Sequence, residues 1–377
     1  MKWQFGSHDI NFLIIHGALH RLAWGGSSTF IGVYLYQQGV SLAGVFLSYT
    51  GILALRFAFR SLLPTLVAMI GMRHTLIFAT FLQAVQYPML ALVHGVGLAL
   101  ALFCAASALG AAFYFTCYHT FFSALGDEQR RGMQIGIRQI MMSAAAVLGP
   151  ALGGAALALF GPWAAFGAAA IVELGAMVPL FALSEVDPGP MAPTDSFAAF
   201  KTGALLLATD GWISNAAVLA WNIIMFRSLS EHFDVFGGAL AAAALVGALF
   251  GAVLGRFIDL GHARKALWFN AAVYGLNLVI KAVCGENPAI VVTVTIVTSM
   301  LTGFYIPALM TAFYNDAKRS RSPFRYQIAS EGAWDVGGLL VTVIAAALCA
   351  AGAPLQVALV LALVMVPIQA ALLHKAY

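Results

Sequence analysis

Long apolar runs, separated by short polar breaks, occupy almost all of this 377-residue chain. Hydrophobic residues make up 62% of the sequence and charged residues 9%, whereas charged residues form roughly 25% of a soluble domain. A mean hydropathy of +0.90 is too high for one water-soluble core. Because a helix needs about 20 apolar residues to cross roughly 30 Å of hydrocarbon, the runs predict an all-α, multi-pass membrane protein.

Twelve of the apolar runs are long enough to be membrane-spanning helices. They cover residues 10–36, 41–60, 75–93, 96–124, 132–159, 162–184, 198–227, 236–257, 265–283, 288–315, 326–351 and 353–374. Between the sixth and seventh runs lies a stretch rich in proline and acid, in which Pro188, Pro190 and Pro193 cannot continue a helix. The sequence therefore predicts a six-helix bundle at 1–184, a cytoplasmic linker at 185–197 and a second six-helix bundle at 198–377.

The distribution of basic residues predicts the orientation of these spans. Short cytoplasmic loops carry an excess of Lys and Arg, and with the N-terminus inside, 16 of the 19 basic residues fall at or near the inner face. Among these 16 are Arg56 and Arg60, at the end of the second predicted span; Arg21, Arg227 and Lys281 fall elsewhere. We therefore expect both termini to be cytoplasmic, in a bacterial inner (plasma) membrane.

Several classes of function lack their sequence signals. A nucleic-acid partner needs a basic cluster on a soluble surface, and none is present. The four cysteines, Cys104, Cys117, Cys284 and Cys349, lie scattered in apolar segments without a CxxC pair, which is typical of small buried residues. The chain also lacks an HExxH helix and a phosphate-binding loop. We expect no metal, no cofactor, no nucleic acid and no enzymatic activity.

A local pattern occurs twice, about 190 residues apart. Phe113-Tyr114, Thr120-x-Phe122 and Gln134-Ile135 with Arg138 recur as Phe304-Tyr305, Thr311-x-Phe313 and Gln327-Ile328 with Glu331. Internal repeats of helical bundles are how many transporters are built, with the substrate site near the midplane between the repeats. The pattern predicts two related halves around a central path.

Six helices, a central linker and six more helices resemble the major facilitator superfamily. That family often carries a loop of glycine, acid and basic residues after its second helix. Here the loop is residues 71–76, with Arg73 but no aspartate, and its copy after the eighth helix contains Arg256 and Asp259. An Asp at a helix end can pair with an Arg of the next loop and close the cytoplasmic face. The resemblance implies gating roles for Arg73, Arg256 and Asp259; positive charge that only sets topology is the alternative.

The fifth predicted helix contains Gly149-Pro150-Ala-Leu-Gly153-Gly154. This segment is similar to the glycine-proline motif of the family's exporters and antiporters, in which small residues let two helices pack closely and the proline bends the helix. The resemblance implies export by antiport. A role limited to helix packing is the other interpretation.

Ionisable side chains at membrane depth are unfavourable by about 2.5–3.5 kcal/mol on insertion scales and usually face a cavity or a partner. In the first span His16 and His20 are four residues apart, hence on one face, beside Arg21. A His pair can exchange protons and an Arg can bind an anion, so His20 is predicted to couple protons, and His16 and Arg21 to bind substrate. Histidines that only pack between helices are the alternative.

The tyrosines of the fourth and tenth spans suit an amphipathic or aromatic substrate, because they combine apolar area with one polar tip. Tyr114, Tyr118 and Tyr305 are therefore predicted to contact substrate, with helix packing as the alternative for Tyr114 and Tyr305. His119 lies nearer the inner end, where a gating or structural role is expected.

The fifth and eleventh spans carry matched polar positions. The repeat aligns Gln134 with Gln327 and Arg138 with Glu331. An ion pair of Arg138 and Glu331 across the path would favour a state closed to the cytoplasm; pairing within each half is the alternative. Asp335 lies one turn further, on the same face, where a carboxylate can carry a proton, and the adjacent Trp334 is predicted to contact substrate.

The seventh span carries Asp210, Trp212 and Asn215. Asp210 lies about a dozen residues into the span, roughly 18 Å at 1.5 Å per residue. It is the first choice for the proton-coupling carboxylate, ahead of Glu331 and Asp335, and a permanent pair with Arg21 or a histidine is the alternative. Trp212 and Asn215 are predicted to contact substrate.

These residues together predict a secondary active transporter that moves a small amphipathic, zwitterionic or anionic organic molecule by alternating access, with proton-coupled export. Its partners would be the substrate, protons and the lipid bilayer, and the protein would be a monomer. Proton-coupled uptake of an organic anion or nutrient is the alternative within the same class. A lipid flippase, a membrane enzyme and a non-transporting sensor are alternatives from other classes.

Overall fold

The structure is a computed structural model that describes residues 8–125, 131–189, 197–257 and 263–376, and within these ranges every regular element is helical. The first half contains α1 (His8–Ser27), the 3₁₀ helix η1 (Ser28–Phe30), α2 (Ile31–Gln37), α3 (Leu42–Arg60), α4 (Leu63–Ile70), α5 (Met72–Ala91), α6 (Leu98–Leu125) and α7 (Arg131–Leu180). The second contains α8 (Phe197–Ser228), α9 (Phe233–Phe257), α10 (Ala263–Val283), α11 (Pro288–Arg319), α12 (Pro323–Ala350) and α13 (Val357–Ala376). The prediction of an all-α protein is confirmed.

The described helices include eight that are long and apolar enough to cross a membrane, or nine if the bent pair α4 and α5 forms one span. The predicted number of twelve is not confirmed by this test. Helix α10, for example, contributes only the shorter apolar stretch Leu267–Val283. Helix α7 contains a non-helical residue, Gly161, with φ 78°, at the break predicted between the fifth and sixth spans.

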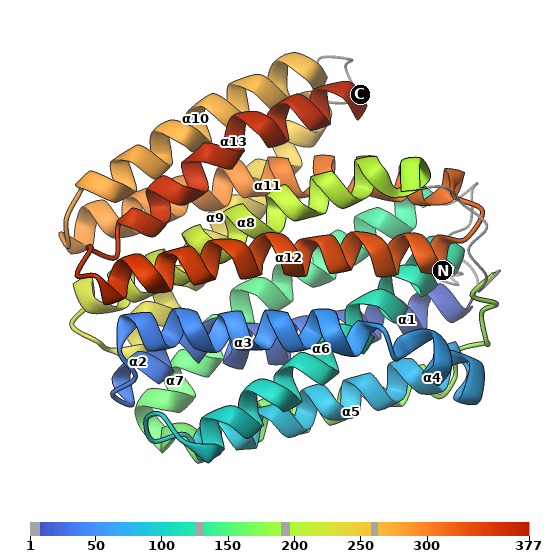
Figure 1. The fold of residues 1–377 in the computed structure, drawn as a ribbon, viewed down its shortest axis with the longest axis horizontal. Coiled ribbons are helices and arrows are strands. Elements are labelled where there is room, and N and C mark those ends of the chain that lie inside the picture. Colours follow the sequence, from blue (N-terminus) through green and yellow to red (C-terminus); the bar gives the residue numbers. More distant parts are fainter. Residues whose placement is uncertain (1–7, 126–130, 190–196, 258–262, 377) are drawn as a thin grey trace, which may run out of the picture.

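Figure 1 shows α1 to α7 in the lower part of the view and α8 to α13 in the upper part, with both labelled termini toward the right. Helices α3 and α12 run side by side across the middle and are in extensive contact. Helices α7 and α9 form a second contact between the two parts of the chain. We call α1–α7 the N-terminal half and α8–α13 the C-terminal half, so these two helix pairs form the main contacts between the halves.

Capping side chains explain where several of these helices begin. Ser41 accepts a hydrogen bond from the Gly44 N–H at the start of α3, and Ser322 accepts one from the Arg325 N–H at the start of α12. Asn287 accepts bonds from Ala289 and Ile290 at the start of α11. An oxygen at this position satisfies backbone donors that have no partner inside the helix.

Glycines set the closest approaches between helices. A Cβ on Gly153 would run into the backbone of Gly26 in α1, and a Cβ on Gly149 would lie 2.9 Å from the Cα of Gly25. Gly154 faces Phe233 and Gly237 of α9 in the same way. The glycine-proline segment therefore packs α7 closely against both α1 and the C-terminal half, which confirms the close packing expected of its small residues.

Helix α3 ends at Arg60, where the second predicted span ends. After two residues the apolar chain continues as α4, which ends at Gly71 with φ +83°, where α5 begins at an angle of 119° to α4. The Glu185 carboxylate accepts hydrogen bonds from the backbone N–H groups of Met72 and Arg73, at 2.5 and 3.1 Å. An acidic side chain from the beginning of the linker thus caps α5, in the loop whose sequence lacks the family's aspartate.

Candidate functional site

A buried cluster of charges joins α3 to α12. The Asp335 carboxylate lies 3.0 Å from Arg56 Nε and 2.6 Å from Arg60 Nη2. Glu331, one turn earlier on α12, lies 3.8 Å from Arg56 and 4.0 Å from Arg60. All four side chains are buried, and Asp335 has no exposed surface. Because each half supplies one sign of charge, the cluster holds the two halves together at this point.

Further contacts fix these arginines within the N-terminal half. Arg60 Nη1 donates hydrogen bonds to Thr116 Oγ1 at 2.5 Å and to the Ala112 carbonyl at 3.3 Å, both on α6. The Arg56 guanidinium lies over the rings of Phe115 and Trp334, at 5.6 and 5.0 Å from their centres. The positive side of the cluster is therefore held in place by α6.

His119 of α6 brings a third helix to the same interface. Its Nε2 lies 3.7 Å from the Glu331 carboxylate, and its Nδ1 lies 2.6 Å from the Tyr314 hydroxyl on α11. Phe122 of α6 also packs against Tyr314. Helices α6 and α11, which carry the two copies of the aromatic repeat, therefore meet beside the charge cluster.

Asp210 of α8 lies in a hydrogen-bonded group within the C-terminal half. Tyr305 donates its hydroxyl proton to Asp210 Oδ1 at 3.0 Å, and Trp334 Nε1 donates to Oδ2 at 3.0 Å. Trp334 is also the ring that stacks with Arg56. One indole thus joins Asp210 to the charge cluster, so a change of charge at either site alters the surroundings of the other.

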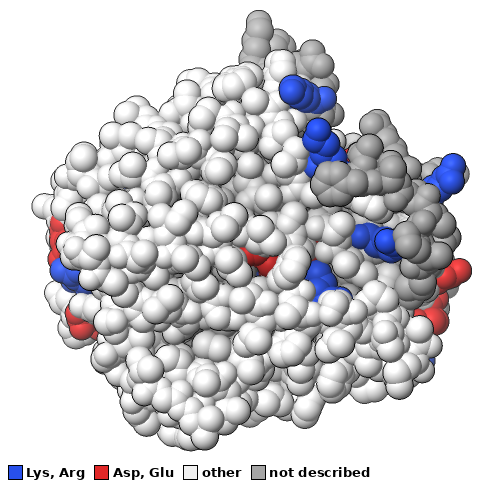
Figure 2. Space-filling view, in the orientation of Figure 1, with Lys and Arg blue, Asp and Glu red and all other residues white. Residues whose placement is uncertain are grey.

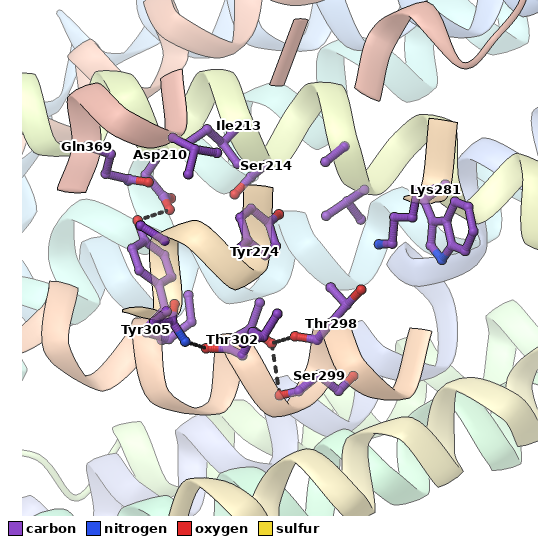
Figure 3. A pocket seen from close by; sticks show the side chains of 18 of the residues that line it. Asp210, Ile213, Ser214, Tyr274, Lys281, Thr298, Ser299, Thr302, Tyr305 and Gln369 are labelled. Carbon is purple, nitrogen blue, oxygen red and sulfur yellow. Dashed lines mark hydrogen bonds between the residues drawn. The ribbon is translucent and has the colours of Figure 1, made fainter. Parts of the chain in front are cut away.

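A cavity of about 240 Å³ lies between helices α8, α10, α11 and α13 of the C-terminal half. Figure 3 shows Asp210, Tyr305 and Gln369 at one end and Lys281 at the other. Its walls are largely apolar, with a few polar side chains from each helix, including Ser214, Tyr274, Thr298, Ser299 and Thr302. A concave site with a few convergent polar groups is the usual form of a small-molecule site.

The two histidines of α1 are bound inside the N-terminal half. His20 Nδ1 lies 2.8 Å from the carboxylate of Glu173, which has no exposed surface. His16 contacts the Ala176 carbonyl at 2.8 Å and the Tyr114 hydroxyl at 3.1 Å. The His20 ring stacks on Tyr114 at 3.9 Å. This geometry fits histidines that hold α1 against α6 and α7.

Arg138 lies among aromatic rings of the N-terminal half. Its Nε donates a hydrogen bond to the Tyr118 hydroxyl at 3.4 Å, and its guanidinium lies 4.6 Å from the centre of the Phe122 ring. Arg21 lies over Trp24 at 4.8 Å and interacts electrostatically with Arg138. Among the described residues Arg138 therefore does not form the predicted ion pair with Glu331. Glu331 does pair across the halves, but with arginines of α3.

The remaining predicted site residues contact other helices or loop carbonyls, or lie outside the described residues. Trp212 Nε1 donates to the Leu361 carbonyl at 2.8 Å, and Asn215 bonds to the Gly211 carbonyl and packs on Gly338 of α12. Arg73 Nη1 donates to the Leu183 carbonyl at 2.9 Å, so it holds the end of α7.

Gln327 is completely buried, and neither of its amide atoms has a hydrogen-bond partner among the residues described. Asp259 lies outside the described residues, as do the side chains of Gln134 and Arg256.

Three groups of functional interest were missed from sequence. Arg56 and Arg60 were assigned to the inner face, but both are buried between the halves, at 7% and 2% exposure. Their spacing of four residues, the same as that of Glu331 and Asp335, was the available signal, because it places each pair on one face of its helix. Lys281 has no expected role beyond falling away from the inner face, but it is 3% exposed and lines the cavity. Glu173 had no assignment.

Comparison with known proteins identifies the family. A family model described as Major Facilitator Superfamily matches residues 13–342, and the chain belongs to this family. It is a membrane transporter rather than an enzyme. Among curated proteins, none matches the chain by sequence.

Solved transporter structures share the fold over nearly the full length. The human organic anion transporter MFSD10 (TETRAN) matches with a TM-score of 0.70 and 13% identity, over 97% of this chain and 99% of that one. The POT family transporter PepTSo matches with a TM-score of 0.66 and 14% identity, over 98% of each chain. The nucleoside transporter NupG matches with a TM-score of 0.66 and 12% identity, over 98% and 99%. At these identities the likeness shows the fold alone.

Proposed function

We propose that the chain is a proton-coupled secondary transporter in which the N-terminal and C-terminal halves rock against each other. The observation that carries this proposal is the buried cluster of Arg56, Arg60, Glu331 and Asp335 between α3 and α12. A buried ion pair is weak evidence of stability, because desolvation offsets much of the Coulomb energy. A contact that must form and break once in every cycle is a better reason for charges at this place.

Protonation supplies a way to open the contact. Glu331 lies 3.7–4.0 Å from its three basic neighbours, a looser arrangement than that of Asp335 at 2.6–3.0 Å. Protonation of Glu331 or Asp335 would remove one negative charge from this contact, and the looser contacts of Glu331 are the ones that separate most readily. Asp210 communicates with this event through Trp334. His20, held by Glu173, has a supporting role within its half.

The organic substrate is proposed to be amphipathic and to carry negative charge or both charges. Support comes from the basic and aromatic group of Arg21, Arg138 and Tyr118 in one half and from Asp210 with Tyr305 in the other. Of the similar structures named above, one is described as an organic anion transporter and another as a nucleoside transporter, and organic anions are such molecules. Export in exchange for protons is the direction favoured by the glycine-proline segment.

The surface supports a cytoplasmic position for both termini. In Figure 2 Lys and Arg gather toward the right-hand edge of the view, the side on which both termini are labelled in Figure 1, while most of the face is uncharged. Such an asymmetry is expected of the inner side of a membrane protein. Charged atoms also show near the middle of this face, in the region that α12 crosses.

Transport in proteoliposomes tests the proposal. Candidate substrates are first found by thermal-shift screening of metabolites, because a bound ligand stabilises by mass action. The protein is then placed in vesicles that contain a pH-sensitive dye, and each candidate is added on one side of the membrane. If the substrate exchanges for protons, its movement down its gradient drives protons toward the side to which it was added. Movement of substrate without proton movement would contradict the coupling, and proton movement in the same direction as substrate would replace export with uptake.

A further inference from the structure

The cavity of the C-terminal half contains a buried cation without an acidic partner. Lys281 extends from the last turn of α10 and is 3% exposed. Its Nζ lies 4.6 Å from the centre of the Trp221 ring, which also lines the cavity. No acidic side chain pairs with Lys281 in the part of the chain that the structure describes. Glu286, five residues later, pairs with Arg227 at 2.8 Å.

A lysine in this position is unfavourable for the empty protein. Burial of an ammonium group is tolerated when the charge is paired and hydrogen-bonded, and a Trp ring supplies only part of that compensation. An anion in the cavity would supply the rest. Asn222 of α8 also lines the cavity and offers an amide donor to a ligand there.

We propose that this cavity binds a small organic carboxylate, with the carboxylate at Lys281 and an apolar body enclosed by α8, α10, α11 and α13. The cavity lies within the C-terminal half and is lined by Asp210 and Tyr305, the group proposed above to meet the transported substrate. The inference therefore rests on the proposed function and names a ligand class for this part of the site.

The opposite end of the cavity fixes the direction of the ligand. Asp210 lies there and is negatively charged unless protonated, and its two oxygens already accept bonds from Tyr305 and Trp334. A second carboxylate is repelled from that end and attracted to Lys281, which Figure 3 shows at the far side. Between the two lie apolar walls that include Ala217, Ala271 and Val366. A dicarboxylate fits this arrangement poorly, because its second carboxylate would lie near Asp210.

The cavity has room for a small aromatic acid. Its volume of about 240 Å³ is many times the roughly 10–15 Å³ that one water needs in a cavity. Benzoate, with one ring and one carboxylate, is a ligand of suitable size. Two lining residues, Val218 and Ile306, are 55% and 44% exposed, so the cavity reaches the surface of the structure beside them and a ligand has a route in.

Equilibrium binding of radiolabelled benzoate to the purified full chain in nanodiscs tests the proposal. Benzamide and benzylamine have the same ring with a neutral or a positive group, and they serve as competitors. We expect saturable binding of one benzoate per chain, with benzamide at least tenfold weaker and benzylamine inactive. Absence of saturable benzoate binding, or equal competition by benzamide, would overturn the proposal.

Substitutions identify the site. Lys281→Met keeps the length of the side chain without its charge and should weaken benzoate at least tenfold, the factor expected for loss of a hydrogen bond to a charged group. Lys281→Arg should retain binding within a few fold. Ala271→Phe fills the cavity while Lys281 remains and should abolish binding. Lys201→Met, on an exposed part of α8, is the matched control and should leave binding unchanged.

Two results would place benzoate elsewhere and refute the proposal. One is an affinity of Lys281→Met within twofold of that of the unmodified chain. The other is full binding by Ala271→Phe. The binding experiment and the transport experiment can fail separately. If the chain binds benzoate at Lys281 but transports no substrate, the proposed function is wrong and the binding site stands.

Discussion

Neutralising Asp335 should open the contact between the two halves. The Asp335 carboxylate is completely buried and contacts two arginines, at 3.0 and 2.6 Å. Asp335→Asn keeps the shape of the side chain but leaves Arg56 and Arg60 buried without their closest counter-charge. Removal of one partner of a buried ion pair destabilises by about 3–5 kcal/mol. Since 1.4 kcal/mol is a factor of ten, the closed arrangement should lose a factor of about 10² to several thousand relative to an open one.

The distance between spin labels at His74 and Lys201 measures this shift. Both positions are exposed, the first on α5 and the second on α8, so the label pair reports the separation of the halves by electron–electron resonance. We expect one narrow distance distribution for the unmodified chain and a second, longer population for Asp335→Asn. Asp316→Asn is the matched control, because Asp316 accepts its bond from Tyr326 within the C-terminal half.

A double-mutant cycle separates the contact from general damage. Arg60→Gln alone should also shift the distribution, and the combination of Arg60→Gln with Asp335→Asn should shift it by less than the sum of the two, because both remove the same interaction. Identical distributions for Asp335→Asn and the unmodified chain, or strictly additive shifts, would refute the role assigned to the cluster.

Three further substitutions probe other parts of the structure. Gly154→Val should weaken the contact of α7 with α9, where an added Cβ runs into the Phe233 carbonyl, and should lower the melting temperature, whereas Gly167→Val, with open space at its Cβ, should not; equal melting temperatures would contradict this. Glu173→Gln removes the counter-charge of His20 and should lower the melting temperature with no change in the distance between the halves; an altered distance would assign the pair to the interface. Lys281→Met removes a buried cation and should raise the melting temperature of the ligand-free chain by several degrees; a decrease would show that Lys281 is already compensated.

The sequence was informative about the fold because the membrane imposes a simple rule. Segments that cross lipid must satisfy their own backbone and expose apolar side chains, so the helices follow from apolar runs and from breaks such as Gly161. The close packing around Gly153 and Gly154 could also be predicted, since small residues in membrane helices mark close approaches. The number of spans was less certain, because the separate helix α4 and the short apolar part of α10 do not follow from the apolar runs alone.

The partners of the charged residues were much harder to predict. Repeat symmetry placed Arg138 opposite Glu331, but symmetry relates positions within each half and does not say which helices of the two halves touch. Contact between α3 and α12 brings Arg56 and Arg60 to Glu331 instead. Positive charges at the end of a span usually mark the inner face of the membrane. Arg56 and Arg60 therefore gave no indication that they pair with carboxylates of the other half.

The cavity could not be predicted from the sequence, because it depends on how closely the side chains of α8, α10, α11 and α13 pack together. Asp210 and Tyr305 were identified as site residues from their polarity at membrane depth, and the structure brings them together. Lys281 carries the same polarity signal. Its position near the end of a span gives no indication of a cavity, and the contact with Trp221 follows only from the packing of α10 against α8.

A reversible cross-link between α3 and α12 tests most directly whether these helices must separate during transport. The hydroxyls of Thr50 and Thr342 lie 2.9 Å apart across this contact, so cysteines at the two positions, in a chain whose four native cysteines are replaced, should form a disulfide on oxidation. We predict that oxidation stops substrate transport in proteoliposomes and that a reductant restores it. Transport at the unmodified rate by fully cross-linked protein would contradict the movement of the two halves.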